Sequence, residues 1–294
     1  MNLTSLFSRQ LTDLLAYVLI PLMAVITTAS FSRRILRRAS TWDWFLALTA
    51  EAAYEGARKH VDIPDKEQWK RRWKQVELLD ARDLYMMVFG RARSVLSEIE
   101  RPPDFETARD RVMVGMHWGP AISILKLLET TGLKPAFTFR PTEPHLRRSR
   151  PFAYVYSRLT GVYLSRTLAD RAVQVGGAGD VLQGLLEQPG SICVLMDAPP
   201  MLGRPAIAEP VLGAEARFNA GFPTLLAQGT KEYVLYAMNL SNDGSLRKKL
   251  EVAGPFSSDN AKEFMDNYAA FLDRHLFKDS PQWRIWHAEH QFWS

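Results

Sequence analysis

The sequence predicts an α/β protein in which a mixed sheet is layered with helices and an apolar helix precedes the sheet. Three observations predict this fold: an uncharged run near the N-terminus, a helical stretch that ends near residue 100, and short apolar runs that alternate with helical patterns beyond it. Strands that alternate with helices along a chain favour a sheet covered by helices.

The composition is that of a globular protein with a sizeable core. The 294 residues are 47% hydrophobic and 23% charged, which is enough apolar surface for one large domain and argues against disorder. The excess of 37 Lys and Arg over 32 Asp and Glu gives a net charge of +5, too small to indicate a nucleic-acid-binding protein. We find no internal repeat and no low-complexity linker, so we divide the chain into an N-terminal anchor segment, residues 1–40, and an α/β domain, residues 41–294.

The N-terminal segment has the pattern of a membrane anchor. Residues 14–32 form a run of 19 residues without a charge, just long enough for a transmembrane helix across a hydrocarbon core about 30 Å thick. Pro21 and the pair Thr27 and Thr28 weaken that span. A basic cluster follows the run, and it consists of Arg33, Arg34, Arg37 and Arg38. By the positive-inside rule the cluster and the rest of the chain face the cytoplasm, and the same arginines can bind anionic lipid if the helix only lies in the interface.

A second basic group, further along, is interleaved with tryptophans. The tryptophans are Trp69 and Trp73, and the basic residues are Lys70, Arg71, Arg72 and Lys74. Two interpretations are open: a solvated helix face whose tryptophans pack into the core, or a contact with the membrane interface.

Periodicity predicts the elements of the α/β domain. Apolar residues at three- and four-residue steps predict helices over residues 42–100. Beyond them, apolar runs predict strands at 112–116, 135–139, 191–196 and 233–238. Helices are predicted at 120–131, with Pro120 in the first turn and Gly132 after the end, near Asp180, and at 261–277.

We expect no cofactor and no metal site. Cys193 is the single cysteine and lies in the apolar run 191–196, so we expect a small core residue rather than a nucleophile. The other histidines show no spacing that is typical of a metal site, and His287 is expected to pack, with the tryptophans around it, against the sheet.

The candidate catalytic residue is His117. It lies in segment 115–122, GMHWGPAI, between the end of a predicted strand and the start of a predicted helix, where α/β folds expose functional groups. A neutral imidazole at such a place can act as a general base, and the free amide groups at the helix start can stabilise an anion.

Segment 115–122 resembles the His-x-Gly-Asn-Trp-Glu box of the lauroyl and myristoyl acyltransferases of lipid A biosynthesis, a branch of the lysophospholipid acyltransferase superfamily. Four further segments resemble motifs of that family in the same order, up to about residue 287. They are Phe139-Arg140-Pro141 followed by Arg147, Arg148 and Arg150; the strand end VLMDAPP at 194–200; Leu212-Gly213 followed by Gly221 and Leu225-Leu226-Ala227; and Pro281-Gln282-Trp283 followed by Trp286-His287.

The resemblance implies a glycerolipid-acyltransferase-like fold at the cytoplasmic face of a bacterial inner membrane. It implies transfer of a fatty acyl group from a thioester, on acyl carrier protein or coenzyme A, to a hydroxyl of a lipid or glycolipid. In that mechanism His117 removes the proton of the acceptor hydroxyl, and an apolar groove binds the acyl chain. The substrate-binding residues that it implies are Trp118, Gly119, Arg140, Arg147 and Arg150. The last two would dock an acidic carrier protein or a lipid phosphate, and a solvated helix face is the alternative for them.

Ile122 departs from the family's box, which has a carboxylate five residues after the histidine. A carboxylate beside a catalytic imidazole fixes its tautomer, and its loss from a Ser-His-Asp triad costs about four orders of magnitude in rate. Three hypotheses follow. Another acid orients His117, with Asp197 the first candidate because it also ends a strand, ahead of Glu51 and Glu55; a capping role is the alternative for Asp197. A histidine without an acid suffices for a thioester, or the chain is a catalytically inactive relative that binds lipid or acyl groups.

Overall fold

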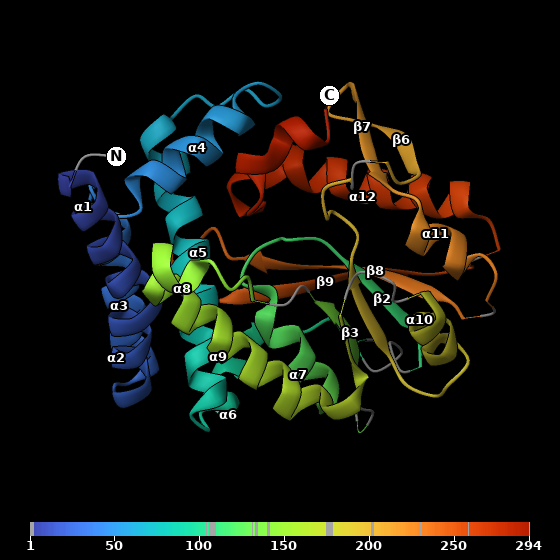
Figure 1. The fold of residues 1–294 in the computed structure, drawn as a ribbon, viewed down its shortest axis with the longest axis horizontal. Coiled ribbons are helices and arrows are strands. Elements are labelled where there is room, and N and C mark those ends of the chain that lie inside the picture. Colours follow the sequence, from blue (N-terminus) through green and yellow to red (C-terminus); the bar gives the residue numbers. More distant parts are fainter. Residues whose placement is uncertain are drawn as a thin grey trace.

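A seven-stranded sheet forms the middle of the molecule, and helices cover both of its faces (Figure 1). The computed structural model describes residues 3–103, 105, 110–130, 132, 135–139, 142–174, 179–200, 203–229, 231–257 and 259–293, with side chains from residue 8 onward. The strand order is β1-β9-β8-β2-β5-β3-β4. The strands are β1 (Ile99–Glu100), β2 (Val112–Gly115), β3 (Ala136–Phe139), β4 (Ala172–Gln174), β5 (Ile192–Leu195), β8 (Tyr233–Leu240) and β9 (Lys248–Phe256), and a separate hairpin joins β6 (Ala206–Val211) to β7 (Ala214–Asn219).

The centre of the sheet is parallel and one side of it is antiparallel. Strand β2 pairs in parallel with β5 on one side and β8 on the other, so that Val112 lies opposite Ile192 and Tyr233. Strand β8 pairs antiparallel with β9. All four residues of β2 are buried, as expected for a parallel strand with helices on both faces. The predicted α/β fold with a mixed sheet layered with helices is therefore confirmed.

Two separate parts of the core lie on the two faces of the sheet. Val112 and Val114 belong to a cluster that contains residues of α12 (Ala261–Asp279) and the C-terminal tryptophans. Met113, between them, belongs to a cluster with α7 (Ile124–Glu129) and α9 (Pro151–Leu168). This alternation is the two-residue period of a strand. Cys193 in β5 is fully buried, and burial raises the pKa of its thiol well above the usual value, so its predicted role as a core residue is confirmed.

The predicted helices between residues 42 and 100 form three elements, α4 (Ala47–Ala57), α5 (Lys66–Val88) and α6 (Ala92–Leu96). Helix α5 begins at a cap, because the Asp65 side chain accepts a hydrogen bond from the Gln68 amide at 2.9 Å. Trp69 and Trp73 are buried at 5% and 2% exposure. The second basic group is thus a helix face whose tryptophans pack into the core. The shorter helices α8 (Leu146–Ser149), α10 (Gly179–Leu186) and α11 (Gly221–Leu226) complete the domain.

The N-terminal segment consists of two helical stretches that meet at Thr27. Helix α1 (Leu3–Leu14) continues through a π-helical turn (Leu15–Leu19) into α2 (Ile20–Ile26). Thr27 is extended, and Thr28 then caps α3 (Ala29–Ser40) by accepting from the Phe31 amide. Because Thr27 breaks the helix, the uncharged run 14–32 does not form the single helix that its length predicts. Within the described part of the chain, one helix, Ser8–Ile26, is long and apolar enough to cross a membrane.

Candidate functional site

The candidate site lies where two adjacent parallel strands end. Strand β2 leads into the loop that carries His117, and β5 leads into the loop that carries Asp197. Gly115 and Leu195, the last residues of these strands, are paired in register, and the next amide, Met196 N–H, still donates to Gly115 O at 3.0 Å. Because both loops leave the same edge of the sheet, two residues further along each of them brings His117 beside Asp197.

The Asp197 carboxylate holds the His117 imidazole. His117 Nδ1 lies 2.8 Å from Asp197 Oδ1, and the His117 amide donates to Asp197 Oδ2 at 2.6 Å. The indole Nε1 of Trp283 donates to the same Oδ2 at 2.7 Å. A carboxylate accepts, so Nδ1 carries the proton and Nε2 is the basic nitrogen. The structure thus places Asp197 where an orienting acid is required.

Burial differs within this pair. The Asp197 side chain is 0% exposed, whereas the His117 side chain is 34% exposed. A buried ionised carboxylate is costly unless donors surround it, and the two N–H groups and the imidazole are such donors. The outward-facing member of the pair is therefore the imidazole.

The C-terminal segment 282–284 runs beside the His117 loop and fixes its backbone. Gly119 N–H donates to Gln282 O and Arg284 N–H donates to His117 O, each at 2.8 Å. Gly119 has φ +57°, and a Cβ at this position would lie 1.8 Å from Met238 O. Only glycine fits the loop at that position.

Trp118 and Gly119 follow His117 in the loop, and Trp118 packs into the core. The Trp118 indole is 1% exposed, and its Nε1 donates to Asn239 Oδ1 at 2.9 Å. The resemblance implies that these two residues bind substrate. The structure buries the Trp118 side chain in the core, and both residues line a small cavity of about 80 Å³ beside His117. The Trp118 backbone also pairs with that of Trp283 in an isolated antiparallel bridge.

Ile122, which stands where the family has a carboxylate, is held through its backbone by another acid, Asp80. The amide of Ile122 donates to Asp80 Oδ1 at 3.1 Å, and Arg284 Nη1 lies 2.8 Å from Asp80 Oδ2. Asp80 thus caps the 3-10 turn Ala121–Ser123 and is ion-paired. The other acids considered from the sequence lie elsewhere, because Glu51 pairs with Lys66 and Lys70, and Glu55 pairs with Arg58.

The two predicted arginines that the structure describes, Arg147 and Arg150, do not line the cavity at His117. Arg140 lies outside the described residues. Arg147 is exposed on α8 and lines a separate, open hollow with Arg148 and Tyr154. Arg150 is bound to Asp13 of α1 by two hydrogen bonds of 2.9 and 2.7 Å, so its guanidinium joins the N-terminal helices to α9.

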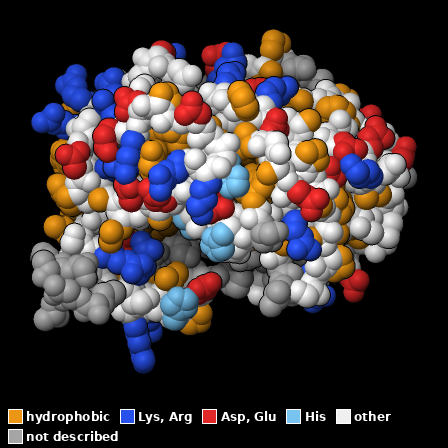
Figure 2. All heavy atoms as spheres, turned by 90° about the horizontal axis from the view of Figure 1, so that it is seen from above, with side chains coloured by type: hydrophobic (Ala, Val, Ile, Leu, Met, Phe, Trp, Pro, Cys, Tyr) orange, Lys and Arg blue, Asp and Glu red, His pale blue; other side chains and the backbone are white. Residues whose placement is uncertain are grey.

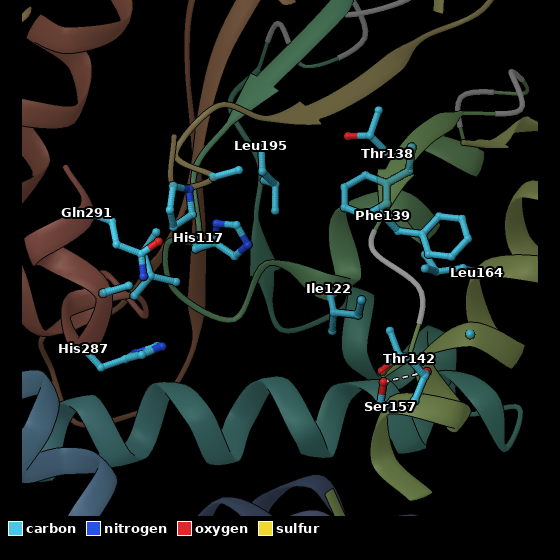
Figure 3. A pocket seen from close by; sticks show the side chains of 17 residues that line it. His117, Ile122, Thr138, Phe139, Thr142, Ser157, Leu164, Leu195, His287 and Gln291 are labelled. Carbon is cyan, nitrogen blue, oxygen red and sulfur yellow. Dashed lines mark hydrogen bonds between the residues drawn. The ribbon is translucent and has the colours of Figure 1, made fainter. Parts of the chain in front are cut away.

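A cavity of about 510 Å³ opens in front of His117. Figure 3 shows His117 and Leu195 on one wall, His287 and Gln291 toward one end, and Phe139 and Leu164 toward the other. Histidine side chains also gather in the middle of the face seen in Figure 2. The apolar side chains of the other end are Ile122, Phe137, Phe139, Leu164 and Leu195. Four hydroxyl-bearing residues also line the cavity, namely Thr138, Thr142, Ser157 and Thr160, and the hydroxyls of Thr142 and Ser157 are 2.8 Å apart.

Two residues of the polar end were not predicted from the sequence. His287 and Gln291 lie on the 3-10 turn Trp286–Gln291, and they line the cavity. The expectation that His287 packs against the sheet is therefore wrong; Trp286, its neighbour, is the packed residue, fully buried with Nε1 donating to Ser280 O at 2.7 Å. Although His287 itself is exposed, the surrounding walls lower the pKa of its imidazole by desolvation.

The chemistry available at the site is that of an oriented imidazole. Across the described ranges, no three histidine, cysteine, aspartate or glutamate side chains are grouped as metal ligands are. No protein-family model matches this chain, and no curated protein matches it significantly. The site must therefore be interpreted from its own geometry: a histidine–aspartate pair in a cavity that is apolar at one end and polar at the other.

Proposed function

We propose that the chain is an acyltransferase that moves a fatty acyl group from a thioester to a hydroxyl of a lipid or glycolipid. The observation that carries the proposal is the His117–Asp197 pair, which presents His117 Nε2 to a cavity of about 510 Å³ between an apolar and a polar end. The motifs of the lauroyl and myristoyl acyltransferase branch agree with it. Acyl carrier protein or coenzyme A is the proposed donor, and the cytoplasmic face of a bacterial inner membrane is the proposed location.

The proposed reaction needs one general base. His117 Nε2 takes the proton of the acceptor hydroxyl while the hydroxyl oxygen attacks the thioester carbonyl carbon. The tetrahedral intermediate then collapses, the carbon–sulfur bond breaks, and the imidazolium returns the proton to the leaving thiolate. Asp197 keeps Nδ1–H in place and stabilises the imidazolium, as the acid of a catalytic triad does. This step forms no covalent enzyme intermediate.

The two ends of the cavity suit the two substrates. Aromatic and branched side chains on β3, α9 and β5 surround the apolar end, where an acyl chain loses contact with water. His287 and Gln291 at the polar end offer neutral hydrogen-bonding groups to a hydroxyl-bearing head group. His117 lies between them, where a thioester carbonyl and an acceptor hydroxyl would meet.

The competing function is an acyl- or lipid-binding protein that uses the same cavity without chemistry, and the departure at Ile122 favours it. One experiment separates the two functions. Release of free thiol from palmitoyl-coenzyme A is measured in the presence of vesicles of bacterial polar lipid, with palmitoyl-carrier protein as the second donor. Replacing His117 with alanine is expected to lower the rate by about 10²–10⁴-fold, the usual contribution of a general base.

The matched control is His145→Ala, because His145 is 69% exposed and pairs only with the exposed Glu143. It is expected to leave the rate unchanged. Binding of palmitoyl-coenzyme A is measured on all three proteins by fluorescence titration. A chain that binds the thioester but releases no more thiol than its His117→Ala variant, with either donor, is the inactive binding protein.

A further inference from the structure

The outer face of the N-terminal helices is apolar along α2 and apolar and basic along α3. Four residues of α2 and its preceding turn recur at helical spacing and are 41%, 41%, 41% and 79% exposed; they are Leu19, Leu22, Met23 and Ile26. Phe31 of α3 is 45% exposed, and Arg34 and Arg38 follow it at three and seven residues, also exposed. Large apolar side chains in a row are unusual on a surface that faces only water.

The inner face of the same helices is part of the core. Ala16, Ile20 and Ala24, at steps of four residues, are at most 5% exposed and pack against α5 and its neighbours. Leu36 and Ala39 of α3 are fully buried in the same region. Figure 1 shows α1, α2 and α3 together along one edge of the molecule, with α1 and α2 end to end. The N-terminal helices α1, α2 and α3 are thus an integral layer of the domain.

Polar side chains of the domain hold the three N-terminal helices in this position. Arg91, before α6, donates from Nη1 to Val25 O and to Thr27 O, each at 2.6 Å. These carbonyls lie at the C-terminal end of α2, where backbone acceptors have no partner within the helix. The Arg150–Asp13 pair holds α1, and an ion pair of Arg33 with Glu98 holds α3.

These contacts are incompatible with a helix that leaves the domain to cross a bilayer. The Ser8–Ile26 helix could span only if its partners followed it into the hydrocarbon core, or if its buried contacts broke. The partners include the charged side chains Arg91 and Arg150, the helix itself carries Asp13, and intramembrane charges of this kind are expensive. A helix that lies in the interface keeps all of the contacts, because only its outer face meets lipid.

We infer that the α2–α3 pair lies in the plane of an anionic membrane surface and that the chain stays on one side of the bilayer. Leu22, Met23, Ile26 and Phe31 enter the boundary between head groups and acyl chains, and Arg34 and Arg38 bind lipid phosphates. This assignment deepens the membrane location in the proposed function and replaces the spanning anchor. It is tested by partition and not by catalysis, so an inactive chain that binds vesicles contradicts only the proposed acyl transfer.

The first measurement is cosedimentation of the full chain with phosphatidylcholine vesicles that contain phosphatidylglycerol. The quadruple variant Leu22→Ser, Met23→Ser, Ile26→Ser, Phe31→Ser is expected to lower the partition coefficient at least about 100-fold, because each exposed apolar side chain adds to interfacial binding. The double variant Arg34→Gln, Arg38→Gln is expected to lose about five-fold per arginine on anionic vesicles, with little change on pure phosphatidylcholine.

The matched control is Val181→Ser, since Val181 is 55% exposed on α10, at the opposite end of the molecule in Figure 1. Its partition should equal that of the natural chain. Thermal unfolding is followed for all variants, which alter exposed side chains and should unfold as the natural chain does. Unchanged partition of a folded quadruple variant overturns the inference, as does a dimer in vesicle-free solution that the same four substitutions dissociate.

The second measurement decides between a surface helix and a spanning one. Ser8→Cys and Thr41→Cys place one thiol at the start of the helix and one after α3, both at exposed positions, whereas the natural Cys193 is fully buried. A membrane-impermeant maleimide is added to intact spheroplasts and to inverted membrane vesicles from cells that express each variant. Labelling of both positions in inverted vesicles only is expected. Labelling of the two positions from opposite sides establishes a spanning helix and overturns the inference.

Discussion

The His117 loop and the α2–α3 pair are attached to the same domain in contrasting ways. The loop is fixed through its backbone: residues 117 and 119 bond to residues 282–284, and Gly119 lies too close to Met238 O for any side chain. The helix pair is fixed on one face by packing and by a few side-chain bonds, while its other face is exposed and apolar. The comparison shows that this chain combines a site of fixed geometry with an exposed apolar surface, which suits a fluid partner such as the proposed membrane surface.

The largest expected effect is on the rate of the proposed reaction and comes from the acid that orients His117. Asp197→Asn keeps the shape of the side chain but can present an amide N–H to His117 Nδ1, which favours the wrong tautomer. The rate of thiol release is expected to fall by about 10³–10⁴-fold, as it does for the equivalent change in a catalytic triad. Asp243→Asn, in an exposed turn, is the control and should retain full activity. An active Asp197→Asn variant would mean that His117 works without its acid.

A smaller effect is expected from the indole that holds the acid. Trp283→Phe removes the 2.7 Å bond to Asp197 and keeps most of the packing. A hydrogen bond to a charged group contributes about 1.5–3 kcal/mol, so kcat should fall by about 10–100-fold while KM changes little. Trp286→Phe is the matched control, because it removes a 2.7 Å bond to a backbone carbonyl at comparable burial. Equal losses of kcat in both variants would show that Trp283 acts only through stability.

On the other side of the comparison, Arg91 bonds to two backbone carbonyls at the end of α2. Arg91→Gln is expected to lower the free energy of unfolding by about 1–3 kcal/mol, because two carbonyls of the α2 end lose a charged donor. Urea unfolding measures this change. Arg93→Gln, at an exposed position two residues further along in α6, should change the free energy by less than about 0.5 kcal/mol. A helix pair that is independent of the domain would respond equally to both substitutions.

The smallest effect is expected from His287 at the polar end of the cavity. Its pKa in the folded chain lies below 6.5, the ordinary value, chiefly because of desolvation. The unfolded chain therefore binds a proton at a higher pH than the folded chain does, and this residue lowers stability as the pH falls through 6.5 toward the lowered pKa. The decrease in Tm from pH 7 to pH 5 should be smaller in His287→Gln, by less than about 2 °C. His145→Gln serves as the comparison and should follow the natural chain.

Much of the fold could be predicted because buried strands appear in the sequence as short runs of apolar residues. The strands at 112–116, 191–196 and 233–238 were predicted from apolar runs and are β2, β5 and β8. Strand β9 could not be predicted in this way, because Lys249 and Glu251 interrupt its apolar residues and Pro255 lies near its end. Lys249 is paired with Glu100 of β1, to which it also forms an ion pair of 2.8 Å. Glu251 and Pro255 are tolerated because β1 pairs only with the start of β9, which leaves the rest of β9 at an edge of the sheet.

The candidate site was predicted in part. His117 could be predicted because a histidine between a strand and a helix is visible locally. His287 could not, since the turn Trp286–Gln291 shows no periodic pattern that distinguishes its packed side from its open side. The buried Trp286 and the exposed His287 are adjacent in sequence, and only the packing of Trp286 behind the turn determines that His287 lines the cavity.

By itself the sequence determined the α/β class, the apolar character of the N-terminal segment and the position of His117 after a strand. These features depend on periodicity over a few residues, which burial imposes directly on the chain. The sequence named Asp197 as the first candidate acid with a capping role as the alternative, and only the tertiary structure decided that it contacts His117, 80 residues away, because that contact requires β2 and β5 to be adjacent and in register. The turn at Thr27 and the contacts of Arg91 likewise decided that the apolar run folds back onto the domain, since packing against α5 outweighs the local tendency to continue one helix.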